Sequence, residues 1–119
     1  MAAPRFEVRL TRGAEDDLER LYDYLSKQGS PATAEALLDS ILEKVEALER
    51  YPRRGSVPRE LAGIGIRTFR QLVHPPYRIV YRVVGAEVFV LLIADGRRDM
   101  QALLERRLVD PGRSEAEEE

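Results

Sequence analysis

Two stretches in the C-terminal half carry the apolar pattern of β-strands. In residues 77–84 aromatic and aliphatic side chains occupy every second position, and Arg78 and Arg82 stand between them. This is the period of a strand with two chemically different faces. Residues 88–94 are entirely apolar, as is typical of a buried strand. Because Gly85 between the two runs tolerates a positive φ, we predict an antiparallel hairpin over residues 77–94.

The N-terminal half begins with a strand pattern and continues with the period of helices. Residues 6–10 alternate like a half-buried strand. Thr11 can cap a helix whose apolar residues recur at spacings of three and four until Gln28-Gly29 ends it. Ser30-Pro31 then starts a second helix that ends before Pro52. A short connection between two helices predicts an antiparallel helical hairpin over the sheet. From the second helix we expect burial of Leu37, Leu38, Ile41, Leu42, Val45 and Leu48.

The remaining segments complete an α+β prediction. Residues 53–65 contain Gly and Pro and predict a loop, whereas residues 66–73 predict a strand that His74-Pro75-Pro76 ends in a turn. Residues 100–108 have near-helical spacing and predict a short terminal helix. The predicted order is strand, helix, helix, three strands and short helix, with a mainly antiparallel sheet. We expect one domain over residues 1–109 and a disordered acidic tail over residues 110–119.

Composition narrows the possible chemistry. The 119 residues include no cysteine and one histidine, so no clustered metal-ligand set is indicated, and we predict no cofactor and no small-molecule substrate. No apolar run reaches the length of a membrane helix or a signal core, so we expect a cytoplasmic protein without membrane contact. Charge is unevenly distributed. Residues 1–52 carry seven basic and eleven acidic side chains, whereas residues 53–109 carry eleven and five. The basic half could attract phosphate or an acidic partner, or it could simply be a solvated charged surface.

Several motifs occur in a fixed order. They are LTRGAEDDLERLYDYL in the first helix, PRRG after the second helix, PYRIVYRV in the long strand and GRRD after the last strand. Together with the order of elements, they closely resemble the RelE/ParE superfamily of toxins from type II toxin–antitoxin systems, over about residues 6–99. The resemblance implies a small protein that inhibits growth, is neutralised by a cognate antitoxin and can serve in plasmid stabilisation.

The superfamily contains two mechanisms. RelE-like toxins cleave mRNA on the ribosome, whereas ParE-like toxins bind DNA gyrase and are not nucleases. Cleavage through a 2′-hydroxyl needs a base, a cation and an acid. RelE-like nucleases usually place a Tyr or His beyond the last strand, and this chain has neither after Ala94. Asp95 and Asp99 are poor bases because two neighbouring arginines should lower their pKa. The sequence favours a ParE-like toxin; the alternatives are a ribosome-dependent endoribonuclease and an inactive relative that only binds an antitoxin.

The candidate site residues depend on the mechanism. For a ParE-like toxin we predict no catalytic residue, and the resemblance implies a target-binding surface that includes the helix expected over residues 100–108. Its predicted contact residues are Arg97, Arg98, Asp99, Arg70 and Arg82. For a nuclease the candidates are Arg67, Arg78, Arg82, Arg98 and His74, because guanidinium groups bind phosphate bidentately. Simpler structural interpretations also exist for these residues. His74 could be a turn residue, Tyr77 and Tyr81 could face the core, and Arg98 and Asp99 could form an ion pair that closes the strand. Family members often carry a His at the position of Asp95.

The resemblance also implies a partner, an antitoxin whose C-terminal segment folds as it binds. An amphipathic helix could lie against the helical hairpin, and a strand could be added to an open sheet edge. We predict that the antitoxin contacts Leu21, Tyr22, Leu25 and Leu38. The basic half of the chain would favour an acidic antitoxin segment.

Overall fold

The computed structural model describes residues 5–109. Its four-stranded sheet has the order β1-β4-β3-β2. The edge strand β1 (Glu7–Leu10) runs parallel to β4 (Glu87–Asp95). β3 (Tyr77–Val84) is antiparallel to β4 and to the other edge strand, β2 (Phe69–His74). The predicted α+β class and mainly antiparallel sheet are therefore confirmed.

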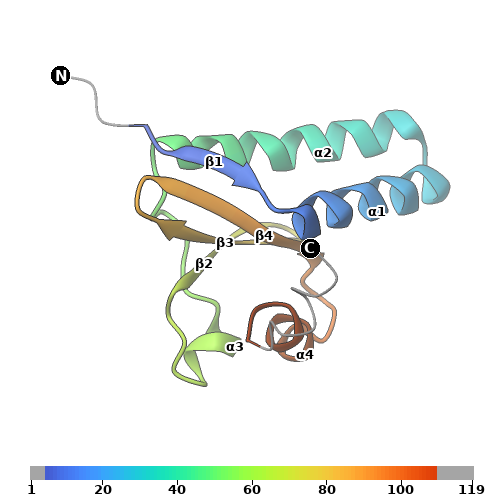
Figure 1. Ribbon diagram of the computed structural model, residues 1–119. Coiled ribbons are helices and arrows are strands. Elements are labelled where there is room, and N and C mark those ends of the chain that lie inside the picture. The colour runs from blue at the N-terminus through green and yellow to red at the C-terminus, as the bar shows by residue number, and fades with distance from the viewer. Residues whose placement is uncertain (1–4, 110–119) are drawn as a thin grey trace.

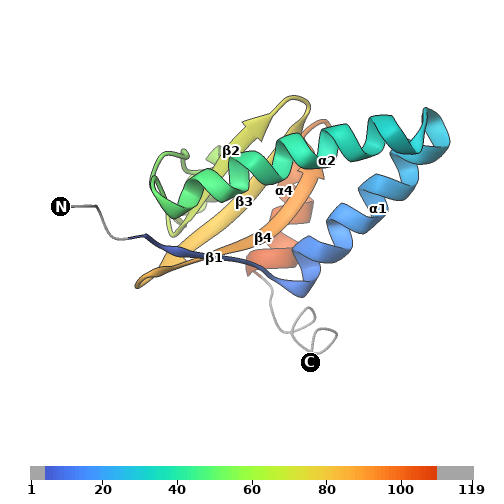
Figure 2. The same ribbon diagram turned by 90° about the horizontal axis from the view of Figure 1, so that it is seen from above.

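Helices cover both faces of the sheet (Figure 1). The hairpin of α1 (Arg12–Gln28) and α2 (Pro31–Glu46) lies on one face, and a 3₁₀ turn, Ala47–Glu49, extends α2. The short helices α3 (Arg59–Ala62) and α4 (Met100–Leu104) lie on the other face. A π-helical turn, Glu105–Val109, continues α4. Seen from above, α2 crosses the strands while the tip of the hairpin extends beyond the sheet (Figure 2).

The ends of the two long helices follow the predicted capping residues. Thr11 Oγ1 accepts a hydrogen bond from the backbone N–H of Ala14, and Ser30 Oγ accepts one from Thr33. Each cap satisfies a donor that the first helical turn leaves free. Pro31 stands at the start of α2, where its missing N–H costs no hydrogen bond.

Two apolar clusters, one on each face, hold the sheet between its helices. The first joins Ile41, Val45 and Leu48 to strand residues that include Ile79 and Tyr81. The second packs Leu61 of α3 and the apolar residues of α4 against Val80 and Leu92. A β-bulge shifts the register between Val80 and Tyr81. Tyr77 and Tyr81 are both buried in the first cluster, as the simpler interpretation of these residues expected.

Four predictions about individual segments are wrong. The segment 53–65 is not wholly a loop, because α3 forms within it after Pro58, and its Leu61 is fully buried. β2 starts at Phe69 rather than at residue 66, and it includes His74, which pairs with Tyr77 across a two-residue Pro75-Pro76 turn. His74 is thus a strand residue. Leu42 is 38% exposed rather than buried, because it lines an open space between α2 and β1.

The tail at residues 110–119, which we predicted to be disordered, lies outside the described residues. Among residues 5–109, no helix has the length and apolar character needed to cross a membrane.

Candidate target-binding surface and cleft

Arg78 is held inside the molecule by α3. Its Nη1 and Nη2 atoms each lie 2.8 Å from a carboxylate oxygen of Glu60, and its Nε donates to Gln71 Oε1 at 2.7 Å. Both charged side chains are mostly buried, with 13% and 14% of their surface exposed. The hydrogen bonds from Arg78 lower the pKa of Glu60 to about 2. Because the guanidinium fork of Arg78 is filled, it is not free to bind phosphate, which a nuclease site would require of it.

The glycine of the GRRD motif is explained by the same arginine. A Cβ atom on Gly96 would lie 2.9 Å from Cδ of Arg78 and 3.1 Å from the carbonyl oxygen of Pro76. The backbone N–H of Gly96 donates to that carbonyl at 2.7 Å. Gly96 therefore allows the chain to close tightly over Arg78 as it leaves β4.

Arg70 holds the PRRG motif against the sheet. Its Nη1 donates to the carbonyl oxygens of Arg53 and Gly55, at 3.2 and 2.7 Å. The N–H of Gly55 donates to the hydroxyl of Tyr81 at 3.0 Å. A Cβ atom on Gly55 would lie only 2.5 Å from the carbonyl oxygen of Gln71. Arg70 thus fastens a loop at a place where only glycine fits.

The charged turn after β4 has a network of its own. Arg97 donates to both carboxylate oxygens of Asp95, with a shortest distance of 2.6 Å. Hydrogen bonds from Arg97 lower the pKa of Asp95 to about 2, and Arg98 adds a smaller attraction. Asp99 caps α4 by accepting a hydrogen bond from the N–H of Ala102 at 3.1 Å. Both carboxylates are therefore occupied, and Asp95 is a weak proton acceptor.

The other predicted residues are spread over the surface. Arg98 is exposed, and its side chain makes no hydrogen bond or ion pair within residues 5–109, so the alternative of an Arg98–Asp99 ion pair is wrong. Arg82 is exposed, with its guanidinium 6.0 Å from the ring centre of Phe69. Arg82 lies about 17 Å along β3 from Tyr77, the first residue of that strand. Arg67 is also exposed, and His74 is half-buried at the end of β2. The structure therefore does not bring the nuclease candidates together at one site with side chains free to bind RNA.

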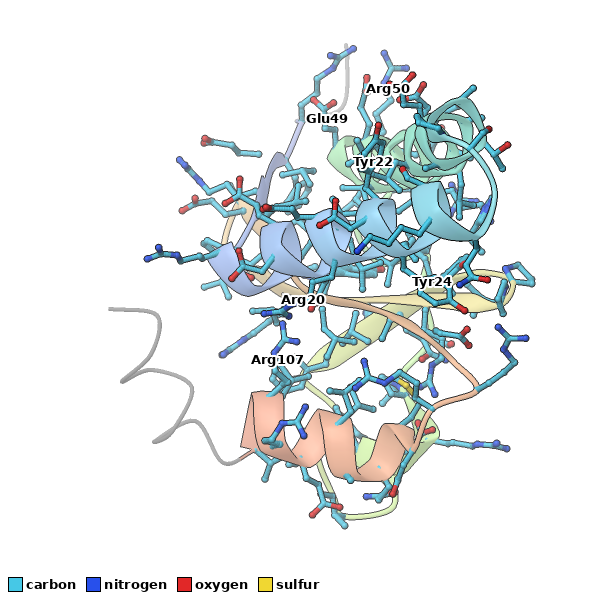
Figure 3. The ribbon with its side chains drawn as sticks, turned by 90° about the vertical axis from the view of Figure 1, so that its right-hand side faces the viewer. Arg20, Tyr22, Tyr24, Glu49, Arg50 and Arg107 are labelled. Atoms are coloured by element: carbon cyan, nitrogen blue, oxygen red, sulfur yellow. The ribbon has the colours of Figure 1, made fainter. Side chains whose placement is uncertain are left out.

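A cleft of about 370 Å³ lies beside Arg98, between α1 and the sheet. Helix α1 lines it with Asp17, Arg20, Leu21 and Tyr24. The opposite wall comes from the start of β3, the end of β4 and the turn, through Tyr77, Ile93, Ala94, Asp95 and Arg98. Arg20 and Tyr24 project from the side of α1 that faces the C-terminal helix, whereas Tyr22 points toward α2 (Figure 3). The cleft thus joins residues from three separate parts of the chain.

An ion pair fixes one end of this cleft. Arg107 donates to the two carboxylate oxygens of Asp17 at 3.1 and 3.2 Å, and to the carbonyl oxygen of Leu91 at 2.9 Å. Asp17 also accepts a hydrogen bond from the N–H of Ile93 at 3.0 Å. The side chain of Asp17 is only 9% exposed. This contact ties the C-terminal helical segment to α1 and β4 (Figure 3).

The predicted antitoxin contacts lie on the helical hairpin and are all half-buried. Leu21 packs partly against the core and also lines the cleft. A second groove, of about 380 Å³, runs between β1 and α2, with Val8, Leu10 and Leu42 among its walls. The N–H groups of Glu7 and Thr11 bind carbonyl groups of the β4 side of the sheet, at Ala86 and Val90. Successive residues of a strand direct their backbone N–H and C=O groups to opposite sides. Those of Val8 and Leu10 therefore point away from β4, to the open edge of the sheet.

Four residues that shape the cleft were not predicted from the sequence: Asp17, Arg20, Tyr24 and Arg107. One signal was present, because Asp17 lies three residues after Ala14 and four before Leu21, on the apolar stripe of its helix. An acidic residue on that stripe needs a partner. Nothing in the spacing identifies Arg107 as that partner. Within residues 5–109, no three His, Asp or Glu side chains form a group that could hold a metal ion.

Comparison with known proteins gives a consistent family relationship. Residues 8–100 match the family model described as the ParE toxin of the type II toxin–antitoxin system parDE. The chain is 31% identical over 97 residues to Toxin ParE3 of Caulobacter vibrioides, covering 82% of this chain and 93% of the relative. The chromosomal ParDE system of P. aeruginosa is similar in structure, with a TM-score of 0.65 and 25% identity over 76% of this chain and 96% of its own. The toxin–antitoxin complex RelBE2 of Mycobacterium tuberculosis shares the fold, with a TM-score of 0.54 and 21% identity over 79% and 94%.

Proposed function

The chain belongs to the ParE toxin family of type II toxin–antitoxin systems, and on that premise we propose that it inhibits growth by binding DNA gyrase. The proposal is supported mainly by charged groups near the GRRD motif that are already paired with one another. Asp95 is paired with Arg97 and its pKa is lowered to about 2. Arg78 is filled by Glu60. Acid–base cleavage of RNA needs a group poised to transfer a proton, whereas binding a protein target does not.

Arg98 is the centre of the proposed target-binding surface. It is exposed at the turn, next to the Asp95–Arg97 pair and at the mouth of the cleft. An exposed arginine with unfilled donors suits an interface with an acidic protein surface. Of the other predicted contacts, Arg82 is exposed, but Arg70 is committed to the PRRG loop and Asp99 to the cap of α4. The proposed surface is therefore narrower than the sequence suggested.

We also propose that a cognate antitoxin neutralises the toxin in the cytoplasm, where gyrase acts. The half-buried residues Leu21, Tyr22, Leu25 and Leu38 give the helical hairpin an apolar surface for an antitoxin helix. The open backbone groups of β1 could accept an antitoxin strand. Both features support the use of the hairpin side of the molecule by the antitoxin.

Induction of the chain in bacteria tests the proposed target. We expect growth arrest together with a DNA-damage response and gyrase trapped on cleaved DNA, while messenger RNA stays intact at early times. Arg98→Glu should abolish these effects in a folded protein. Arg50→Glu is a matched control, because Arg50 is exposed and lies on the other side of α1 from the cleft (Figure 3). Early mRNA cleavage without a DNA-damage response would instead identify a ribosome-dependent endoribonuclease, and no toxicity would indicate an inactive relative.

A further inference from the structure

The cleft between α1 and the sheet has an apolar floor. Ile93, Ala94 and Tyr77 are each at most 8% exposed and form its base, and Leu21 contributes from α1. Tyr24 stands at the rim with 60% of its surface exposed. A space of about 370 Å³ is large enough for one or two side chains of a bound segment. The floor would bury an aliphatic or aromatic side chain.

The uncommitted charge around this floor is positive. Asp17 is neutralised by Arg107, and Asp95 is neutralised by Arg97. Two further arginines line the cleft. Arg20 forms a long ion pair with Asp17, at 3.8 Å and without a hydrogen bond, and its side chain is 76% exposed and can reach a second anion. Arg98 adds only a minor attraction to Asp95. The cleft therefore offers two arginines to an incoming anion.

We propose that this cleft is an anchor site for an acidic antitoxin segment in which Asp or Glu adjoins a large apolar residue. The apolar side chain would enter the floor, and the carboxylate would lie between Arg20 and Arg98. The inference rests on the proposed function, since it takes the antitoxin as the partner. It deepens that function because Arg98 belongs to both the anchor site and the target-binding surface. An antitoxin held here would neutralise the toxin by covering Arg98.

Two features favour a peptide over nucleic acid. Single-stranded nucleic acid binds through a series of aromatic faces on which its bases stack. Among the described residues that line the cleft, only Tyr24 offers an exposed ring, because Tyr77 is 8% exposed. The rest of the floor is aliphatic, and a phosphodiester backbone would leave it uncovered. The cleft is also continuous with the predicted antitoxin surface through Leu21, which lines it.

Binding of a defined peptide tests the chemistry of the cleft. The probe is acetyl-Asp-Leu-Glu-Phe-amide, titrated into the ¹⁵N-labelled full chain while amide chemical shifts are recorded. We expect saturable shifts at Ile93, Ala94 and Arg98. Arg20→Glu should weaken binding about tenfold, because it replaces an attraction by a repulsion. Arg50→Glu should leave the affinity unchanged.

Three comparison probes make the result decisive. Acetyl-Asn-Leu-Gln-Phe-amide removes the charge, acetyl-Asp-Ala-Glu-Ala-amide removes the apolar anchors, and a short thymidine oligonucleotide keeps only the negative charge. All three should bind more weakly than the first peptide. Equal binding of any of them, shifts outside the cleft, or no saturation at about 10 mM peptide would overturn the proposal.

Toxicity in cells separates this inference from the proposed function. Arg20 is not part of the proposed target-binding surface, so Arg20→Glu should remain fully toxic when expressed alone. Co-expression of the gene that lies beside the toxin gene should neutralise Arg20→Glu less well than the wild-type chain. Equal neutralisation would overturn the anchor site and leave the toxin proposal intact. A harmless wild-type chain would instead overturn the proposed function.

Discussion

At the end of the sheet where β3 begins and β4 ends, the chain places one arginine inside the molecule and another at its surface. Arg78 has its donors filled by Glu60 and Gln71, and 13% of its side chain is exposed. Arg98 is exposed and has no ion pair within the described part of the chain. The two side chains are chemically identical, but only that of Arg98 can be reached by a partner. A count of arginines in the sequence therefore overstates the basic surface that a partner can reach.

The first prediction concerns Arg78, whose loss should have the largest effect on folding. Arg78→Ala leaves Glu60 charged, mostly buried and without its partner, so we expect the free energy of unfolding to fall by about 2 to 4 kcal/mol. Urea unfolding followed by circular dichroism measures the change. Arg98→Ala is the matched substitution and should stay within about 0.5 kcal/mol of the wild-type chain. Similar losses for both variants would erase the distinction between the two arginines.

The pH dependence of stability sharpens the same contrast. The pKa of Glu60 falls from its ordinary value of 4.5 to about 2 in the folded chain. A lowered pKa contributes stability above about pH 4.5, and this stability is lost as the pH falls through 2. The contribution is up to about 3 kcal/mol, an order-of-magnitude figure. Urea unfolding between pH 6 and pH 2 should show this loss in the wild-type chain and a clearly shallower one in Glu60→Gln. Identical pH profiles would contradict the role of the pair.

A third prediction tests the PRRG loop, which Arg70 holds against the sheet. Its acceptor Gly55 lies so close to the sheet that an added Cβ would stand 2.5 Å from the carbonyl oxygen of Gln71. We expect Gly55→Ala to lower the free energy of unfolding by about 1 to 3 kcal/mol through overpacking. In Gly29→Ala the nearest atom would be 3.6 Å from the new Cβ, so this control should change stability little. If the urea midpoints of the two variants agree, the PRRG loop is not clamped as described.

The smallest effect on folding is expected at the surface turn. Arg98→Glu should change the free energy of unfolding by no more than about 0.5 kcal/mol, as other surface substitutions do, while toxicity is lost. Arg97 is a poorer test, because its reversal would also break the contact with Asp95. Growth curves after induction, with circular dichroism of the purified variant, measure both properties. Persistent toxicity in a folded Arg98→Glu protein would remove Arg98 from the target-binding surface.

Most of the fold could be predicted from the sequence because the pattern and the capping residues agree. Alternation identified β3, and Thr11 and Ser30 marked the starts of α1 and α2. α3 could not be found in this way, since four residues between Pro58 and Gly63 are too few to show helical periodicity. Its position depends on Leu61 packing against the second apolar cluster, which is a tertiary effect.

The site was harder to predict than the fold because availability depends on distant partners. Glu60 lies 18 positions before Arg78, and Arg107 lies 90 positions after Asp17. Neither partner can be chosen from local spacing. The prediction that nearby arginines lower the pKa of Asp95 succeeded, since that contact is only two residues long. Local electrostatics could thus be predicted, whereas the division between interior and surface arginines required the structure.

Gyrase itself provides the most direct test of the central claim that this chain binds its target through a surface turn and has no nuclease site. Purified wild-type chain, Arg98→Glu and Arg50→Glu would each be added to a supercoiling assay with DNA gyrase and plasmid DNA. We expect loss of supercoiling and accumulation of cleaved plasmid with the wild-type chain and with Arg50→Glu, but not with folded Arg98→Glu. Unimpaired gyrase in the presence of a wild-type chain that cleaves mRNA on ribosomes would contradict that claim.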